Sequence, residues 1–203
     1  MTPQALGKAL KKLSQQDKDV AKAIQLVGKP QPRNRPASFE TFFSTIVSQQ
    51  ISTHAAKAIM GRIGEFLPTP SADTLLAIDP EQLRSAGMSY RKIEYAQGLA
   101  QAVVEGSFDI AGLDQLSDDE AIAQIVQLKG FGRWSAEIYL MFSLDRRDVL
   151  PADDLAIRVA LGKLKNLQEK PTAKQAREMT SHWAPYRTAG ALFLWHYHQG
   201  APT

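Results

Sequence analysis

The spacing of apolar residues constrains this chain more than any other feature. Apolar side chains recur at the three- and four-residue intervals of an α-helix from one end to the other, as in Leu6, Ala9, Leu10 and Leu13. No stretch shows the two-residue alternation of a half-buried strand. The pattern predicts an all-α protein of roughly ten or more short helices. Short helices at many angles leave concavities, so the pattern suits two helical lobes with a cleft between them but does not by itself establish a cleft.

Capping residues and turn signals give the expected helix boundaries. Thr2 and Pro3 precede the first amphipathic stripe, and Ser38 is a candidate N-cap for the helix that opens the main body. Another helix is expected from Thr53. Further helical patterns run over residues 20–27, 59–66, 71–78, 80–86, 89–104, 117–128, 153–164, 172–183 and 187–198.

Residues 29–36, KPQPRNRP, interrupt the helical pattern. Three prolines in eight residues cannot continue a helix, so this segment is expected to be extended. We therefore divide the chain into residues 1–36, which hold N-terminal helices and a basic linker, and residues 37–203, the main body. We expect the N-terminal helices to pack on the C-terminal ones and to complete a lobe.

Composition excludes several classes of protein. Hydrophobic residues make up 44% and charged residues 22%, which is typical of a globular protein and not of a disordered one. The absence of cysteine excludes disulfides, thiolate catalysis, cysteine zinc sites and cysteine-ligated iron–sulfur clusters. His196 and His198 would point to different faces of a helix, and no cysteine or clustered carboxylate completes a site, so we expect no metal site. The apolar runs are far too short to span a membrane and the start of the chain lacks a secretory stretch, so we expect a cytoplasmic protein.

Positive charge is concentrated at the start of the chain. Residues 1–36 contain eight lysines and arginines against two aspartates, although the net charge of the whole chain is only +3. Such a basic segment is compatible with a surface that faces phosphates. It is also compatible with a helix face that lysines keep solvated.

The most distinctive local feature is the segment LKGFGRWSA at residues 128–136. Here one helix ends, Gly130 and Gly132 flank Phe131 in a tight turn, and a new helix begins. Two glycines allow a positive φ twice. Consecutive backbone N–H groups at such a helix N-terminus form a phosphate site that needs no side chain. The alternative is a plain connector in which the glycines only cap a helix.

Two adjacent carboxylates follow in LPADDLAIR at residues 150–158. Asp153 fits the N-cap position, and Asp154 would then occupy the first helical position and project from the helix end. A carboxylate in that place can stabilise a cation. The alternative is that both residues merely cap the helix.

Together these segments resemble the helix-hairpin-helix (HhH-GPD) superfamily of DNA base-excision glycosylases. Within it, the chain is similar to the 3-methyladenine DNA glycosylase II branch, without the extra N-terminal domain that some members carry. The blocks that carry the resemblance are IVSQQIS at 46–52, LRSAGMSYRKIEYAQGLA at 83–100, LKGFGRWSAEIYLMFSL at 128–144, LPADDLAIR at 150–158 and WAPYRTAGALFLW at 183–195.

The resemblance implies a role for each matched residue. Asp154 is implied as the catalytic aspartate, and Asp153 as its helix-capping neighbour. Trp134 stands where strand-cutting members carry a lysine for a Schiff base, which implies that this chain has no lyase activity. The implied DNA-binding hairpin consists of Lys129, Gly130, Phe131, Gly132 and Arg133. The implied walls of the base pocket are Trp134, Trp195, Tyr139 and Tyr186.

The first of these blocks contains the segment that corresponds to the family's wedge loop. It comprises Gln49, Gln50, Ile51 and Ser52. A base-flipping enzyme inserts a side chain into the space that the base vacates. Matching by position puts Gln50 in that gap, with Ile51 as the alternative, and a polar turn between helices is the reading without such a role.

The implied activity is that of a monofunctional glycosylase for alkylated purines such as 3-methyladenine and 7-methylguanine. An N3- or N7-alkylated purine is cationic and is attracted to an indole face. The expected partner is double-stranded DNA, bound by a monomer, with no cofactor and no metal. Three alternatives stay open: a glycosylase for hypoxanthine, etheno or 1-methyl adducts, a bifunctional glycosylase-lyase, and a non-catalytic hairpin DNA-binding module.

Overall fold

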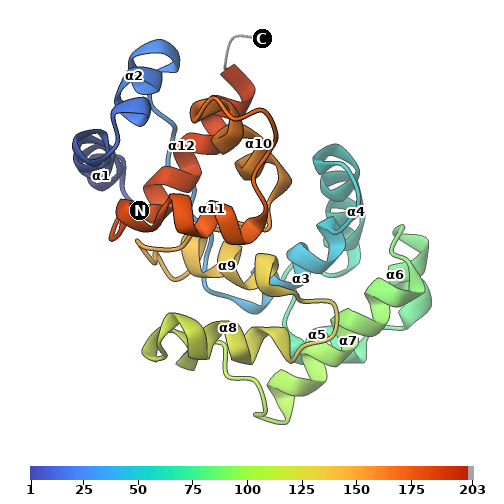
Figure 1. The fold of residues 1–203 in the computed structure, drawn as a ribbon. Helices are drawn as coiled ribbons and strands as arrows, with labels where there is room; N and C mark the ends of the chain where they lie inside the picture. The colour runs from blue at the N-terminus through green and yellow to red at the C-terminus, as the bar shows by residue number, and fades with distance from the viewer. Residues whose placement is uncertain (201–203) are drawn as a thin grey trace. The chain divides into compact units, whose positions relative to one another are not determined.

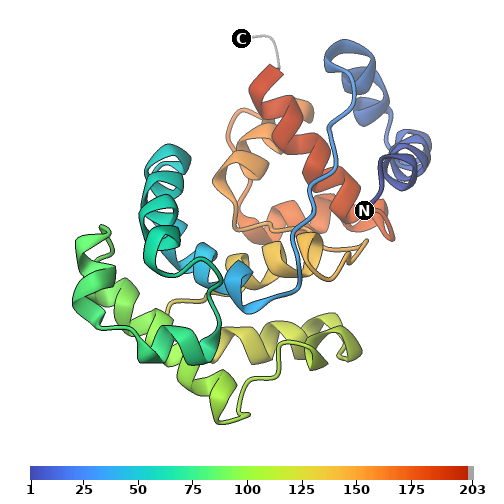
Figure 2. The same ribbon diagram turned by 180° about the vertical axis from the view of Figure 1, so that it is seen from behind.

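The computed structural model describes residues 1–200. Twelve α-helices and two 3-10 helices account for the regular structure of this part of the chain, which holds no strand (Figures 1 and 2). The prediction of an all-α protein is confirmed. None of the helices in residues 1–200 has the length and apolar character that a membrane crossing requires.

The chain forms two compact units. Unit 2 is the continuous segment Arg35–Ala136, whereas unit 1 combines Met1–Asn34 with the chain from Glu137 onward. The first boundary lies in the proline-rich linker expected at residues 29–36. The second lies inside helix α9 (Arg133–Phe142), which supplies the last residues of unit 2 and then continues into unit 1.

Unit 1 is built around its last helix. Residues 188–194 of α12 are buried, and α12 packs against α1, α2 and α10. Figures 1 and 2 show α1 and α10 on opposite sides of α12. The remaining elements of the unit are α1 (Pro3–Gln16), α2 (Lys18–Val27), α10 (Leu155–Leu164), α11 (Ala173–Met179) and η2 (Ser181–Trp183), with α12 at Arg187–Gly200.

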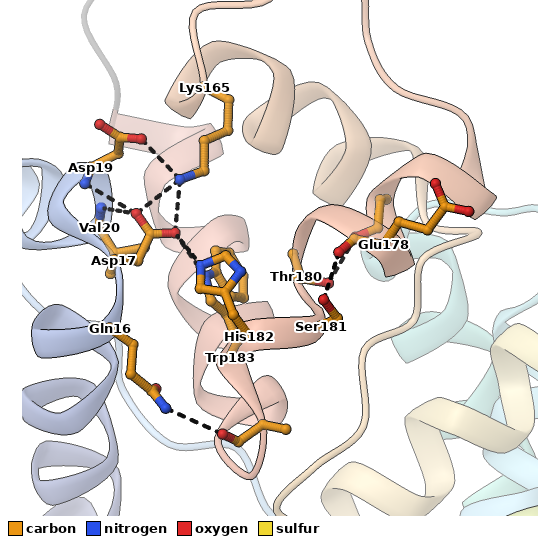
Figure 3. Close-up of polar contacts among 12 residues, drawn as sticks. Gln16, Asp17, Asp19, Val20, Lys165, Glu178, Thr180, Ser181, His182 and Trp183 are labelled. Carbon is orange, nitrogen blue, oxygen red and sulfur yellow. Dashed lines mark hydrogen bonds and ion pairs between the residues drawn. The ribbon is translucent and has the colours of Figure 1, made fainter.

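A buried aspartate ties the first helices of unit 1 to its C-terminal part (Figure 3). Asp17, only 3% exposed, lies between α1 and α2 and accepts the N–H groups of Asp19 and Val20. Lys165 Nζ donates to both carboxylate oxygens at 2.8 Å, and Trp183 Nε1 donates to Oδ2 at 2.8 Å. Burial alone would raise the pKa of Asp17, but the bonds and charge of these donors lower it to about 2. The carboxylate therefore stays ionised inside the protein.

Unit 2 begins at a serine cap. Ser38 Oγ accepts the N–H of Thr41 at the start of α3, which confirms the predicted N-cap. The core of the unit contains Phe42, whose ring meets Phe108 at 5.3 Å and Phe131 at 5.5 Å. Its helices are α3 (Phe39–Ser48), α4 (Thr53–Phe66), α5 (Ala72–Ala77), α6 (Pro80–Ser85), α7 (Tyr90–Val104), η1 (Gly112–Gln115) and α8 (Asp118–Val126), followed by the start of α9.

The helix expected over residues 172–183 is interrupted. α11 ends at Met179 and the 3-10 helix η2 follows, because Thr180 leaves the α-helical conformation with φ −104° and ψ 8°. Its hydroxyl donates to the carbonyl of Ala176 at 2.7 Å. A threonine hydroxyl that bonds its own preceding turn competes with continuation of the helix.

Candidate active site

The turn between α8 and α9 has one left-handed glycine. Gly130 has φ +87°, and a Cβ at this position would overlap the ring of Tyr95. Phe131 anchors the turn because it is buried against Phe42. Of the two glycines that allow a positive φ, only Gly130 adopts one, and Gly132 lies outside the left-handed region.

Gly132 instead opens the next helix. Its carbonyl accepts the N–H of Ala136 at 3.1 Å, the first bond of α9. The N–H groups of the first turn of a helix lie outside the internal ladder, so those of α9 sit at the hairpin. Trp134 belongs to this turn and is 42% exposed. The hairpin thus has the helix-end geometry expected of a phosphate site.

Lys129 lies beside the hairpin with its side chain 76% exposed. Its ammonium donates to Glu94 Oε1 at 2.7 Å, and this bond raises the pKa of Lys129. A phosphate that approached the hairpin would therefore compete with Glu94 for the lysine.

The predicted wedge loop connects α3 to α4. Gln50 has φ +56° and is exposed, and Ile51 is 37% exposed although it is apolar. Ser52 caps α4 by accepting the N–H of Ala55 at 3.2 Å. The loop therefore presents two neighbouring side chains, one polar and one apolar, from a backbone held at its end by a cap.

A side-chain hydrogen bond joins the wedge loop to the hairpin. Gln49 Nε2 donates to the carbonyl of Gly130 at 2.8 Å, across 81 positions of sequence within unit 2. The structure thus brings together two segments that the sequence analysis treated separately. The family resemblance assigned both segments to contact with DNA, which suggested that they lie near each other. No local sequence pattern predicted the hydrogen bond between them.

Lys92, to which the sequence analysis assigned no role, supports the same region. Its ammonium donates to the carbonyl of Val47, near the end of α3, at 2.6 Å. Burial lowers the pKa of Lys92. A cation that bonds a terminal carbonyl stabilises a helix C-terminus, so Lys92 fixes the place where the wedge loop begins.

The N-cap of α10 lies one residue later than expected. Asp154, not Asp153, is the N-cap of α10: its Oδ1 accepts the N–H of Ile157 at 3.0 Å. The chain turns through residues 151–154, where Asp154 N–H donates to the carbonyl of Pro151 at 3.0 Å, so helical geometry starts only at Leu155. Asp153 is exposed and pairs with Arg177 at 2.6 Å.

The aromatic candidates occupy different surroundings. Trp195 is half-buried in α12, with its ring centre 6.0 Å from that of Phe142. The guanidinium of Arg33 lies over the indole at 5.8 Å, so one face of Trp195 already holds a cation. Tyr139 is 5% exposed, and burial raises its pKa to about 12. Tyr186 lines a pocket against α1 whose lining includes none of the other three candidates.

Across residues 1–200, no three His, Cys, Asp or Glu side chains are grouped closely enough to hold a metal ion.

Comparison with known proteins places the chain in a family. The pattern of the HhH-GPD superfamily of base excision DNA repair proteins matches residues 43–185, which include the wedge loop, the hairpin and Asp154. The chain belongs to this superfamily. The resemblance of this HhH-GPD chain to the 3-methyladenine DNA glycosylases is also confirmed, since it is 36% identical over 201 residues to DNA-3-methyladenine glycosylase 1 of Schizosaccharomyces pombe. That match covers 94% of this chain and 87% of the relative.

Solved structures of HhH-GPD proteins show the same fold. The 3-methyladenine DNA glycosylase of Schizosaccharomyces pombe, solved in complex with abasic DNA, is 33% identical with a TM-score of 0.80, over 96% of this chain and 98% of that one. A DNA-3-methyladenine glycosidase from Bacillus halodurans is 33% identical with a TM-score of 0.84, over 94% of this chain and 88% of that one.

Proposed function

We propose that this protein is a DNA glycosylase that removes 3-methyladenine, and with it other alkylated purines such as 7-methylguanine, in base excision repair. The observation that carries the proposal is the position of Asp154, which the cap to Ile157 holds at the start of α10. The proposal also rests on similarity to a protein named for 3-methyladenine over 94% of this chain.

Double-stranded DNA with an alkylated base is the proposed partner, bound by a single copy of the protein. The first turn of α9 would accept a backbone phosphate at Gly130 and Gly132, with Arg133 beside it. Such a contact is independent of sequence and suits an enzyme that searches DNA for damage. The loop that contains Ile51 would fill the space left by the flipped base.

In the proposed chemical step, cleavage of the glycosidic bond, the main contribution of the protein is electrostatic stabilisation. A purine alkylated at N3 carries a positive charge, so heterolysis of the bond between C1′ and the purine nitrogen leaves that electron pair on the base, which departs neutral. Positive charge then develops on the sugar as an oxocarbenium-like species. The Asp154 carboxylate stabilises this charge and orients the water that adds to C1′. The water proton leaves to the carboxylate or to solvent, and the products are free base and an abasic site.

Discrimination against normal bases would come from the aromatic side chains. We assign Trp134 and Trp195 as the indoles that stack on the cationic base. The cation–π attraction contributes about 0.5–2 kcal/mol, and a neutral base is attracted less strongly. Tyr139 is the second candidate for this role, whereas Tyr186 lines the pocket against α1, apart from the other three aromatic residues. Trp134 has no amine to form a Schiff base, so strand cleavage is not expected. Borohydride should therefore trap no covalent complex between this protein and DNA.

The test is release of free base from duplex DNA treated with a methylating agent, with 3-methyladenine and 7-methylguanine separated by chromatography. Wild type should release base, and Asp154→Asn should retain DNA binding while losing nearly all release. Asp153→Asn is the matched control, because it removes the neighbouring carboxylate, whose partner is Arg177. This control should excise at close to the wild-type rate.

Other outcomes would point elsewhere. Equal activity of Asp154→Asn and wild type would remove Asp154 from the mechanism. Release from oligonucleotides with hypoxanthine, etheno or 1-methyl adducts, but not from methylated DNA, would move the activity to those bases. DNA binding without release of any base would favour a non-catalytic hairpin module.

A further inference from the structure

The pocket that Tyr186 lines lies in unit 1, between α1 and the loop that precedes α12. We call it the α1 pocket; its volume is about 740 Å³. Its apolar surface comes from Ala5 and Ala9 on one face of α1 and from Pro185 and Tyr186 on the loop. That volume is typical of pockets that bind a small molecule or a large side chain, about 300–1,000 Å³.

The walls of the α1 pocket are held by contacts within unit 1. Gln16, at the end of α1, donates from Nε2 to the carbonyl of Ala184 at 3.2 Å (Figure 3). Tyr186 N–H donates to the carbonyl of Trp183 at 2.8 Å, which fixes the loop onto the buried Trp183. The helix and the loop that form the pocket are therefore tied to each other and to the buried core of the unit.

Basic side chains surround this apolar surface. Lys8, Lys11 and Lys12 line the pocket from α1 and are exposed, and no carboxylate within residues 1–200 pairs with any of them. Arg147 lines the opposite side, where it pairs with Asp145 at 2.8 Å. No acidic residue lines the pocket in the described chain. Its rim therefore carries a positive charge that its own unit does not neutralise.

We propose that the α1 pocket is a docking site for an acidic segment of a partner protein. One large apolar side chain of that segment would enter between Ala5, Ala9 and Tyr186, and its carboxylates would meet the lysines of the rim. Charge complementarity of this kind gives specificity and speeds association. A nucleic acid strand would satisfy the lysines but would leave the apolar surface unused, so the observations favour a peptide.

The site goes beyond the proposed function. α1 and α10 lie on opposite sides of α12 (Figures 1 and 2), and α10 is the helix that Asp154 caps. The α1 pocket therefore offers a surface for recruitment that base removal does not use.

The test measures binding of a peptide to the full-length protein by fluorescence anisotropy at low salt. The probe is a fluorescein-labelled peptide of about a dozen residues, made of Asp, Glu and Leu with a central Phe, an amphipathic length suited to a groove. Wild type should bind it saturably. Lys8→Glu/Lys12→Glu should weaken the affinity at least about tenfold. Ala5→Trp should have a similar effect without a change of charge, because the indole fills the pocket.

A matched control separates docking from general attraction between charges. Lys18→Glu/Lys22→Glu makes the same change of charge on α2, at exposed lysines outside the pocket lining, and should bind like wild type. Equal weakening in this control, or no saturable binding by wild type, would overturn the proposal. So would lysine-dependent binding of a single-stranded oligonucleotide in place of the peptide. Base release by Lys8→Glu/Lys12→Glu should equal that of wild type. Because peptide binding is measured without any base release, the peptide result can be interpreted even if the glycosylase proposal fails.

Discussion

Gly130 combines a left-handed backbone with a close neighbour. Its φ is +87°, and the ring of Tyr95 stands where a Cβ would point. Gly132, two residues on, has neither feature: its φ is not positive and a Cβ there would meet nothing within 4 Å. The two glycines of one hairpin therefore respond differently to the same substitution.

We expect Gly130→Ala to lower the free energy of unfolding by about 1–3 kcal/mol, since a side chain at positive φ is strained and Tyr95 has to move. At about 2–4 °C per kcal/mol, the melting temperature should fall by several degrees, and affinity for duplex DNA should fall with it. Gly132→Ala is the internal control and should change both quantities little. An unchanged melting temperature for Gly130→Ala would show that the hairpin tolerates a Cβ.

Ile51 and Gln50 compete for the wedge role. Ile51 is an apolar side chain that is 37% exposed in a loop. An apolar side chain of this kind is what proteins insert between unstacked bases. We expect Ile51→Ala to raise the dissociation constant for lesion DNA about tenfold, because it loses contact with the unstacked bases. Gln50→Ala should raise it less. The opposite order in a gel-shift or anisotropy titration would assign the wedge to Gln50.

The elements that present the wedge loop and the hairpin are coupled through Gln49. The end of α3 and the turn before α9 are joined by the bond from Gln49 Nε2 to the carbonyl of Gly130. Lys92, on α7, holds the same end of α3 through Val47. Three helices thus fix the relative positions of wedge loop and hairpin inside unit 2.

Gln49→Met keeps the shape of the side chain and removes its donor. A lost hydrogen bond of about 1 kcal/mol corresponds to a roughly fivefold change in an equilibrium constant. We expect affinity for both damaged and undamaged duplex DNA to fall by about that factor, since the pairing of the two loops serves both. Gln124→Met, at an exposed position of α8, makes the same change where it should have no effect. A loss confined to damaged DNA would instead place Gln49 in lesion recognition.

At the scale of the whole molecule, Asp17 fastens the start of the chain to its end. Its bond to Lys165 spans 148 positions and its bond to Trp183 spans 166. The pKa of Asp17 falls from 3.8 to about 2 on folding, a difference worth about 2 kcal/mol. Because the folded pKa is the lower one, this stability is fully present above about pH 4 and is lost as the pH falls towards 2.

We expect Asp17→Asn to be less stable than wild type near neutral pH, by about 2 kcal/mol or more, since Lys165 loses its buried partner. The difference in free energy of unfolding, measured with urea, should narrow between pH 4 and pH 2. Asp19→Asn removes the other partner of Lys165, which is far more exposed, and should cost much less. A difference that stayed constant with pH would show that the carboxylate charge is not what holds the helices together.

Local sequence patterns predict local structure well in this protein. Ser38 caps its helix as expected because the cap depends on a few adjacent residues. The predicted N-cap, Asp153, was wrong by one position. Either carboxylate can cap a helix, and the turn through residues 151–154 determines that Asp154 does so. The bond of Gln49 to Gly130 and the placing of Tyr186 against α1 depend on contacts between distant segments, which no periodicity or spacing records.

The discontinuity of unit 1 has a consequence for synthesis on the ribosome. Unit 2 is complete once residue 136 has emerged, whereas α1 and α2 must wait for the residues that surround Lys165 and Trp183. Domains generally fold as units as the chain is made. The hairpin and its tie to the wedge loop therefore belong to the part that is finished first. The aspartate proposed to assist cleavage of the glycosidic bond belongs to unit 1, which is finished last. A nascent chain therefore completes the proposed DNA-binding segments before the proposed catalytic residue has its final surroundings.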